Sequence, residues 1–449
     1  MRALLTRAAE LAAGYRAGLP DRPVATATAP AFGGPLPDGP ASPSEVLEEL
    51  ARAAEPGLVA TAGPRFFGFV IGGALPAATA ADVLAAGWDQ NAFNAVLSPA
   101  AAAAEETAGR WLKDLLGLPA TASAGFVTGG QGANTVGLAA ARHHVLAEAG
   151  WDVERDGLAG APRVRIVASE ERHATIDRAL RLLGFGTSAI EPVAAGRQGA
   201  IDVDDLRSTL DAGSGPVIVC LQAGNVNTGA CDDLRAACEA ARAHRAWVHV
   251  DGAFGLWAAA NPATAPLLDG VELADSWACD GHKWLNVPYD SGFVFCARPD
   301  VHAEAIAYRA AYLTGAGEVS GMGDLTLESS RRARGFAVWA ALRELGRDGV
   351  AELVERCCRL ARRFAGRLAA GGAEIANDVV LNQVLVSFGD VDVDALVRNV
   401  QADGTCWLGG TTWRGRRHLR ISVSNWSTTE ADVDRSAAAI LRLAAETRQ

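Results

Sequence analysis

Residues 246–253 read Ala-Trp-Val-His-Val-Asp-Gly-Ala, a short apolar run that ends on an acid and a glycine. Its length and its bulky, β-branched residues predict a buried strand. Runs of the same kind alternate with longer helical patterns, of which 133–149 and 232–244 are examples. This alternation predicts an α/β fold with a mostly parallel sheet covered by helices on both faces. The expected strands are Gly125–Thr128, Val164–Ala168, Val217–Leu221, Ala246–Val250, Ser276–Cys279 and Gly292–Cys296.

Polar or glycine-rich segments follow most of these runs. Open sheets of this kind bind ligands at the carboxyl ends of their strands, so chemically active side chains are expected along that edge. In chain order, the candidate segments are Gly129–Gly132, His173, Asn225–Gly229, Asp251 and Asp280–Lys283.

The sequence on either side predicts two smaller parts. After an opening helix, residues 18–43 are dense in Pro, Gly and Ala, as in an extended connection. Ser42 and Glu45 then have the spacing of a capping box, which predicts the start of a helix. A long helical pattern, 349–370, leads into a smaller α+β region. We expect an N-terminal helical and extended lobe over 1–75, a large domain over 76–345 and a small C-terminal domain over 346–449.

The composition excludes several classes of protein. A net charge of −11 and a pI near 5.3 argue against nucleic-acid binding, which normally needs a basic surface. The eight cysteines form no CxxC pair, so we expect reduced core cysteines and no metal site. No uncharged segment is long enough to span a bilayer. We therefore expect a soluble, cytoplasmic protein that binds neither nucleic acid nor a membrane.

The segment Gly129-Gly130-Gln131-Gly132 precedes an Ala-rich helix. The N–H groups at a helix start attract a phosphate, and glycines allow a ligand to approach the backbone closely. A dinucleotide site is the first alternative, but the spacing is not G-x-G-x-x-G and no clear ribose-binding acid follows. A plain glycine-rich turn would be the simplest explanation if this segment stood alone.

Three side chains near expected strand ends suit a flat, charged cofactor. Asp251 would be costly to bury without a cation, and a pyridinium nitrogen is such a partner; a helix N-cap is the alternative. His173 could lie over a planar ring, although a lone histidine is more often structural. Lys283 lies in an apolar stretch, where desolvation favours the neutral amine that forms an imine, unless the side chain reaches solvent.

Together these motifs resemble the group II pyridoxal-phosphate decarboxylases, which include the aromatic-L-amino-acid, histidine and glutamate decarboxylases. The resemblance extends from about residue 9 to residue 440. It implies fold type I of the pyridoxal-phosphate-dependent transferases, with a seven-stranded sheet, and an intertwined homodimer whose active sites lie at the subunit interface. It is strongest at Arg65-Phe66-Phe67, Ser98-Pro99, Ser169–His173, His249–Ala253 and His282-Lys283-Trp284.

The resemblance also implies roles for single residues. Lys283 matches the lysine that forms the Schiff base, Asp251 the partner of the pyridine nitrogen, and His173 the histidine stacked on the ring. The implied reaction is decarboxylation of an L-amino acid, through an aldimine and a quinonoid, to an amine and carbon dioxide. The other matched positions are Ala253 on the second ring face, Gln131, Gly132 and His282 at the phosphate, Asn227 near the cofactor, and Phe69 and Gly72 at the substrate.

One position departs from the family. The usual proton donor is a tyrosine on a loop upstream of an Arg-Arg pair, and counting back from Arg331-Arg332 reaches Met322. The loop Leu313–Leu327 has no tyrosine, and methionine has no proton to donate. His173, Lys283 or a residue of the partner subunit would then have to serve. Aromatic-acid relatives without this tyrosine can form aldehydes with oxygen, so that product stays open.

The substrate is only weakly indicated. An aromatic pocket and ordinary core packing explain the nearby aromatic residues equally well, and packing is favoured for Phe66. Phe67 and Phe69 would share one face of an extended segment. No arginine stands where it would bind a side-chain carboxylate, which favours an aromatic or apolar amino acid over glutamate. The alternatives are an aminotransferase or carbon–carbon lyase on the same fold, a catalytically silent binding relative, and a nicotinamide enzyme. The aromatic residues in question are Phe66, Phe67, Phe69, Trp88 and Phe93.

Overall fold

A computed structural model describes residues 1–26, 29–30, 32–308 and 321–448. The chain forms two compact units. The first combines Met1–Gly73 with Leu360–Ala376 and Val384–Gln449, and the second combines Ala74–Arg359 with Asn377–Gln383. No helix in the described ranges is long and apolar enough to cross a membrane. The three-part division expected from the sequence stays a prediction.

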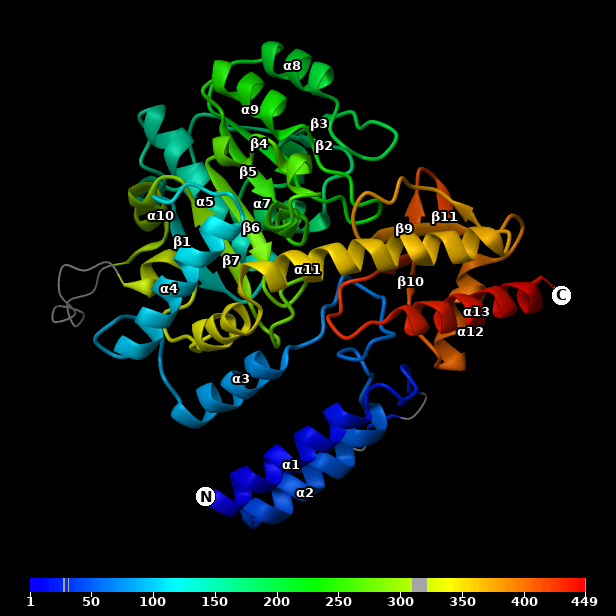
Figure 1. The fold of residues 1–449 in the computed structure, drawn as a ribbon. Helices are drawn as coiled ribbons and strands as arrows, with labels where there is room; N and C mark the ends of the chain where they lie inside the picture. The colour runs from blue at the N-terminus through cyan, green and yellow to red at the C-terminus, as the bar shows by residue number, and fades with distance from the viewer. Residues whose placement is uncertain (27–28, 31, 309–320, 449) are drawn as a thin grey trace. The chain divides into compact units, whose positions relative to one another are not determined.

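The second unit is built on a seven-stranded sheet in the order β1-β7-β6-β5-β4-β2-β3 (Figure 1). Strand β7 runs antiparallel to both of its neighbours, while β6, β5, β4, β2 and β3 pair in parallel. The expected mostly parallel α/β sheet is thus confirmed. Five strands are buried along their whole length, as in a sheet covered on both faces. The strands are β1 (Ser123–Val127), β2 (Arg165–Ser169), β3 (Ile190–Val193), β4 (Val217–Gln222), β5 (Trp247–Asp251), β6 (Ser276–Asp280) and β7 (Gly292–Cys296).

Strand β3 is the one strand of this sheet that the apolar runs did not predict. It is short, and most of its residues are partly exposed, because it lies at the edge of the sheet. Its Pro192 has no N–H to donate, which an edge position tolerates. A short, half-exposed strand with a proline has no apolar run by which the sequence could reveal it.

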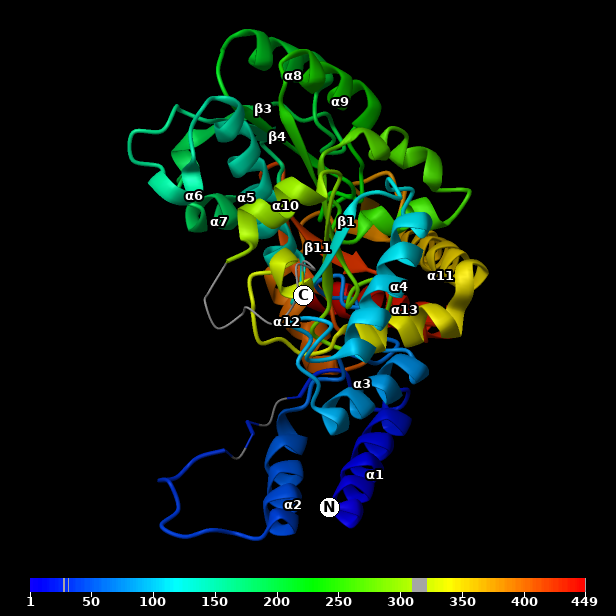
Figure 2. The same ribbon diagram turned by 90° about the vertical axis from the view of Figure 1, so that its left-hand side faces the viewer.

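Helices of the second unit pack against this sheet, and α8 and α9 lie side by side near β3 and β4 (Figures 1 and 2). Helix α5 packs on β5, β6 and β7. A Cβ atom at Gly137 of α5 would lie 2.6 Å from the ring of His249, so a glycine is needed where α5 approaches β5. The helices are α3 (Pro76–Trp88), α4 (Pro99–Leu115), α5 (Gly130–Glu148), α6 (Val153–Asp156), α7 (Ala174–Leu182), α8 (Val203–Asp211), α9 (Leu234–Ala243), α10 (Pro299–Ile306) and the first part of α11 (Gly335–Ala370).

Helix α11 is longer than the expected helical stretch 349–370. It begins at Gly335 and bends at Gly346, where φ is 61° and the backbone leaves the helical region. Glycine adopts this left-handed conformation without a steric penalty. The kink explains why the sequence pattern suggested a helix that starts only after this position.

The first unit contains the two N-terminal helices, the remaining C-terminal helices and a four-stranded sheet in the order β10-β11-β9-β8. The expected capping box is confirmed: the hydroxyl of Ser42 accepts from the N–H of Glu45, whose carboxylate accepts from the N–H of Ser42. The elements are α1 (Arg2–Gly18), α2 (Pro43–Ala54), β8 (Glu374–Ile375), β9 (Gln383–Ser387), α12 (Val393–Asp403), β10 (Gly409–Trp413), β11 (Arg416–Ser422) and α13 (Glu430–Thr447).

The segment around Phe66 is part of the core of the first unit. Phe66 is buried and stacks on Trp407 with ring centroids 4.7 Å apart, as core packing predicts. The expected extended segment is wrong at Phe69, however. Phe69 and Val70 have φ values of 54° and 59°, and a turn places Phe67 in the core while Phe69 is 62% exposed. The two rings therefore do not share one face.

Candidate active site

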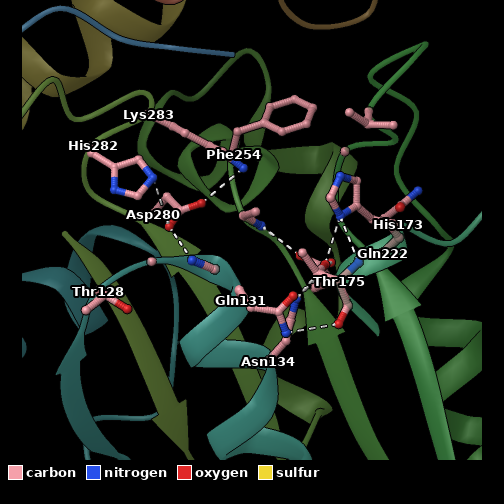
Figure 3. Close-up of a pocket in the computed structure, with 16 residues that line it drawn as sticks. Thr128, Gln131, Asn134, His173, Thr175, Gln222, Phe254, Asp280, His282 and Lys283 are labelled. Carbon is pink, nitrogen blue, oxygen red and sulfur yellow. Dashed lines mark hydrogen bonds and ion pairs between the residues drawn. The ribbon is translucent and has the colours of Figure 1, made fainter. Parts of the chain in front are cut away.

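A cavity of about 300 Å³ lies at the carboxyl ends of the strands in the second unit (Figure 3). This volume suits a small-molecule ligand. The predicted grouping at one sheet edge is confirmed, because residues that follow β1, β2, β4, β5 and β6 all line the cavity. Among the predicted site residues, those that line it are Gln131, His173, Asp251, Ala253, His282 and Lys283.

Asp251 is the last residue of β5, and its carboxylate is buried. Its Oδ2 atom accepts hydrogen bonds from Nδ2 of Asn134 at 3.1 Å and from the hydroxyl of Thr175 at 3.3 Å. Its Oδ1 atom accepts from the backbone N–H of Ala253 at 3.2 Å. These three uncharged donors hold the carboxylate in one orientation at the cavity wall.

A row of buried side chains lies behind Asn134 and fixes its amide. The indole N–H of Trp247 donates to the Ser276 hydroxyl at 2.9 Å, and this hydroxyl lies 2.8 Å from Nδ1 of His249. Nε2 of His249 lies 2.9 Å from Oδ1 of Asn134. Because Asn134 donates its Nδ2 hydrogen to Asp251, its Oδ1 is the acceptor, and Nε2 of His249 must carry the hydrogen.

With its hydrogen on Nε2, a neutral His249 ring accepts the Ser276 hydroxyl hydrogen at Nδ1. Burial lowers the pKa of His249 to about 4, which agrees with a neutral ring. No role of this histidine was predicted from the sequence. One signal was present: His249 and Asp251 stand two residues apart on one strand and so share a face of the sheet.

His173 is the N-cap of α7 and also lines the cavity. Its Nδ1 atom accepts the backbone N–H of Thr175 at 3.2 Å and lies 2.8 Å from the Thr175 hydroxyl, whose one hydrogen it shares with Oδ2 of Asp251. Since a backbone N–H can only donate, Nδ1 is unprotonated and a neutral ring carries its hydrogen on Nε2. The structural and functional explanations of this histidine are thus compatible.

The start of α5 supplies backbone donors to the cavity. The N–H of Gly130 donates to Oδ1 of Asp280 at 2.5 Å. Among the described residues, no protein group accepts from the N–H groups of Gln131 and Gly132. A Cβ atom at Gly129 would lie 2.9 Å from the ring of His282, so a glycine is needed where the start of α5 approaches this ring. Free N–H groups at the start of a long helix fit a phosphate.

Lys283 follows β6, and its Nζ lies 3.0 Å from Oδ2 of Asp280, an ion pair drawn in Figure 3. The surroundings of this amine are thus not only apolar, because a buried carboxylate is its partner. The predicted segment Asp280–Lys283 includes this carboxylate, but no role was predicted for it. Its position at the end of β6 matches that of Asp251 on β5, which is the signal that could have found it.

His282 stands between the start of α5 and a phenol. Its Nδ1 accepts the N–H of Ser291 at 3.1 Å, so its Nε2 faces Oδ1 of Asp280, 3.5 Å away. Its ring stacks on Tyr289 with centroids 4.4 Å apart. Burial lowers the pKa of His282, although the nearby Asp280 carboxylate opposes this shift. Tyr289 is thus a phenol beside the site that was not predicted from the sequence.

The remaining predicted residues lie apart from the cavity lining. Gly132 and Asn227 are not lining residues, although their neighbours Gln131 and Val226 are. Phe69 and Gly72 belong to the first unit, so the cavity of the second unit does not test their contact with a substrate. That assignment stays a prediction.

Part of the predicted proton-donor loop, residues 313–320, lies outside the described residues. Met322 begins the short 3-10 helix η7 (Met322–Leu325) and packs against a buried apolar cluster of Ala92, Ala101 and Ala333. The position where the family usually has a tyrosine is therefore occupied by the packed thioether of Met322.

Residues 29–389 match the family model described as the pyridoxal-dependent decarboxylase conserved domain. The chain belongs to this family. The match covers the whole cavity, including the start of α5, Asp251 and Lys283. Pyridoxal phosphate is therefore the cofactor, and the protein is an enzyme that decarboxylates an amino acid.

Similar proteins support this membership. Tryptophan decarboxylase 1 of Oryza sativa subsp. japonica is 29% identical over 84% of this chain and 80% of its own length. The 4-hydroxyphenylacetaldehyde synthase of Rhodiola rosea is 30% identical over 79% of this chain and 75% of its own length. A crystal structure of Oryza sativa TDC with PLP and tryptamine matches with a TM-score of 0.91 and 26% identity, covering 100% of this chain and 98% of that one. The expected fold type is thus confirmed.

Proposed function

We propose that this enzyme decarboxylates an aromatic L-amino acid to the amine and carbon dioxide, with Lys283 as the residue that binds the cofactor covalently. The observation that carries the proposal is the cavity itself. It combines an amine at Lys283, a buried carboxylate at Asp251 and open N–H groups at the start of α5. These are the groups that an aldehyde, a pyridine nitrogen and a phosphate require.

The composition of the chain supports the role of Lys283. Of 41 lysine and arginine residues, two are lysines, Lys113 and Lys283. Arginine serves as a cation but does not lose its proton in proteins, so a reactive amine must come from a lysine. Nζ of Lys113 donates to the carbonyl groups of Ala120 and Ala122, both at 2.6 Å, which fits a structural role.

The other lining residues bind and orient the cofactor. Asp251 stabilises a protonated pyridine nitrogen. When bound, the cofactor then accepts the electron pair that stays on the α-carbon as carbon dioxide leaves. His173 and Ala253 form walls for a flat ring, while His282 and the start of α5 bind the phosphate. The ring of His173 carries its hydrogen on Nε2 and is a candidate proton source for the α-carbon.

The charge of the lining supports a substrate with an uncharged side chain. Among the described lining residues there is no arginine, and Lys283 is the cation. A side-chain carboxylate would thus find no second cation. The names of the similar proteins agree with an aromatic substrate, since they include tryptophan, tyrosine and aromatic-L-amino-acid decarboxylases. Phe69 and Gly72 remain our candidates for substrate contact.

A second candidate product is an aldehyde formed with oxygen. One observation favours it: Met322, where the family usually has a tyrosine, is a packed residue without a proton to donate. Two similar proteins are aldehyde synthases, the 4-hydroxyphenylacetaldehyde synthase of Rhodiola rosea and the phenylacetaldehyde synthase of a Rosa hybrid cultivar. Hydrogen peroxide accompanies this product and would reveal it.

We also propose that the enzyme works as a homodimer in the cytoplasm. Helix α1 buries none of its residues and α2 buries only Ala53, while Leu5, Val46 and Leu50 are exposed. A second copy would cover such apolar residues. The eight cysteines form no disulfide, which suits a reducing compartment. Light scattering on purified protein tests the dimer, and a mass of one chain would contradict it.

The function is tested by supplying each of the twenty common amino acids and measuring carbon dioxide, amine and peroxide together. We expect carbon dioxide with stoichiometric amine from an aromatic amino acid. Lys283→Ala should lose the near-visible absorbance of the bound cofactor and all turnover. Lys113→Ala is the matched control and should keep both. Keto-acid without carbon dioxide, or an unchanged absorbance in Lys283→Ala, would overturn the proposal.

A further inference from the structure

Asp280 is a second buried carboxylate at the cavity, and the functions assigned above give it no role. It ends β6, and its side chain is 2% exposed. Its Oδ1 atom accepts the N–H of Gly130 at 2.5 Å, and its Oδ2 atom lies 3.0 Å from Nζ of Lys283 (Figure 3). One carboxylate thus connects the start of α5 to the lysine.

These two contacts conflict with cofactor binding. A carboxylate that already accepts from the first N–H of α5 offsets the positive end of the helix and would repel an arriving phosphate. A lysine held as an ammonium ion has no lone pair with which to attack an aldehyde. While Asp280 is ionised and in place, it therefore hinders both the phosphate and the amine.

A single proton transfer removes both obstacles. If the Lys283 ammonium gives one proton to Asp280, the carboxyl group becomes neutral and no longer repels the phosphate. The amine lone pair is then available to bond the aldehyde carbon, and the two hydrogens left on the nitrogen leave with the aldehyde oxygen as water. We propose that Asp280 is a positioning residue that couples phosphate binding to the release of Lys283. This inference rests on the role of Lys283 in the proposed function.

The surroundings of Asp280 differ from those of a purely structural carboxylate in the same unit. Asp232 is equally buried and accepts two backbone N–H groups, from Ile201 and Gln222, both at 2.7 Å. Asp280 has instead one N–H at a ligand-binding helix start, one flexible ammonium group, and Nε2 of His282 3.5 Å from its Oδ1 atom. Its contacts can be exchanged without breaking the sheet, as the coupling requires.

The experiment measures how fast Lys283 reacts with two aldehydes in cofactor-free protein. One is pyridoxal phosphate and the other is pyridoxal, which lacks the phosphate. Each is added at saturating concentration, so that differences in affinity cancel and the limiting rate of absorbance change is compared. Borohydride then fixes the product, and peptide masses locate it. Lys113, the other lysine of the chain, is the internal reference.

In wild-type protein we expect pyridoxal to react about tenfold more slowly than pyridoxal phosphate, and added inorganic phosphate to remove the difference. In Asp280→Asn the pyridoxal rate should rise to that of pyridoxal phosphate, and inorganic phosphate should no longer accelerate it. Asp275→Asn is the matched control, because Asp275 precedes the same strand at its other end, where it accepts the N–H of Val248 and lies 3.5 Å from Arg298. It should behave as wild type.

The outcomes separate this inference from the proposed function. Equal rates for both aldehydes in the wild type, or an unchanged difference in Asp280→Asn, would overturn the coupling while leaving Lys283 as the reactive residue. A product on Lys113 alone, or on neither lysine, would overturn the proposed function itself. If Asp280→Asn does not fold, the wild type alone provides the test. The coupling then requires that inorganic phosphate accelerate the reaction with pyridoxal, and an unchanged rate would overturn it.

Discussion

The two carboxylates of the cavity end neighbouring strands, Asp251 on β5 and Asp280 on β6, yet their surroundings differ. Asp251 accepts hydrogen bonds from three uncharged groups held by the fold, those of Asn134, Thr175 and Ala253. Asp280 faces the charged, flexible side chain of Lys283. We infer that the groups behind a carboxylate, rather than its place at a strand end, decide whether it is a permanent counter-charge or an exchangeable one.

Replacing each carboxylate by an amide should have the largest effect and tests whether Asp251 and Asp280 have different roles. Asp251→Asn should lower kcat/KM about 1,000-fold, because a fixed charge that acts on the reacting electrons is lost. Asp280→Asn should lower kcat/KM of the loaded enzyme by no more than about tenfold, because its role ends when the cofactor is bound. Steady-state kinetics of both variants, with melting curves as a control for folding, make the test. Equal losses would contradict the distinction.

The row of side chains behind Asp251 predicts a pH dependence of stability. Burial lowers the pKa of His249 to about 4 from an ordinary value of 6.5. The unfolded chain therefore binds a proton at a pH where the folded chain does not, and stability present above pH 6.5 is lost as the pH falls towards 4. The shift corresponds to about 3 kcal/mol of unfolding free energy. Denaturant titrations across this range should lose that dependence in His249→Gln.

His302 provides the control for this prediction. Burial also lowers its pKa to about 4, and its Nδ1 lies 2.8 Å from the Ser123 hydroxyl, outside the row that supports Asp251. His302→Gln should flatten the pH dependence of stability to a similar degree but leave the absorbance of the bound cofactor unchanged. His249→Gln should alter both. An unchanged cofactor spectrum in His249→Gln would show that this row of side chains does not support the function of Asp251.

His173 allows a smaller and sharper test, because it serves both as a helix cap and as a cavity wall. Asparagine also caps helices, so His173→Asn should change the unfolding free energy by less than about 1 kcal/mol. The loss of the ring and its Nε2 hydrogen should lower kcat about 100-fold. Chemical denaturation and kinetics on the same samples separate the two roles. If the loss of activity were explained by a loss of stability, His173 would act only as a helix cap.

Several features of the fold were predictable because each is carried by a local pattern. Gly292–Cys296 is strand β7 with the expected bounds, since a fully buried strand is a continuous apolar run. The helix start at Ser42 was likewise encoded by two residues three positions apart. Strand β3 and the turn at Phe69 were missed, because an edge position and a left-handed backbone depend on neighbours elsewhere in the chain.

In the site, too, the features carried by a local pattern were predictable and the others were not. Asp251 and Lys283 could be found because each follows an apolar run, where the sheet geometry brings ligands. The row formed by Trp247, Ser276 and His249 could not, since it joins side chains of two strands through hydrogen bonds that no spacing reveals. For Lys283, the apolar run before it predicted a place at the cavity, but not its ion pair with Asp280, which depends on how the loop after β6 folds back.

A crystal structure of the enzyme with pyridoxal phosphate tests the central claim most directly, that Lys283 and Asp251 hold opposite ends of one ring. We predict continuous density between Nζ of Lys283 and the aldehyde carbon, and a pyridine nitrogen about 3 Å from a carboxylate oxygen of Asp251. A ring joined to another residue, or a nitrogen turned away from Asp251, would contradict the account.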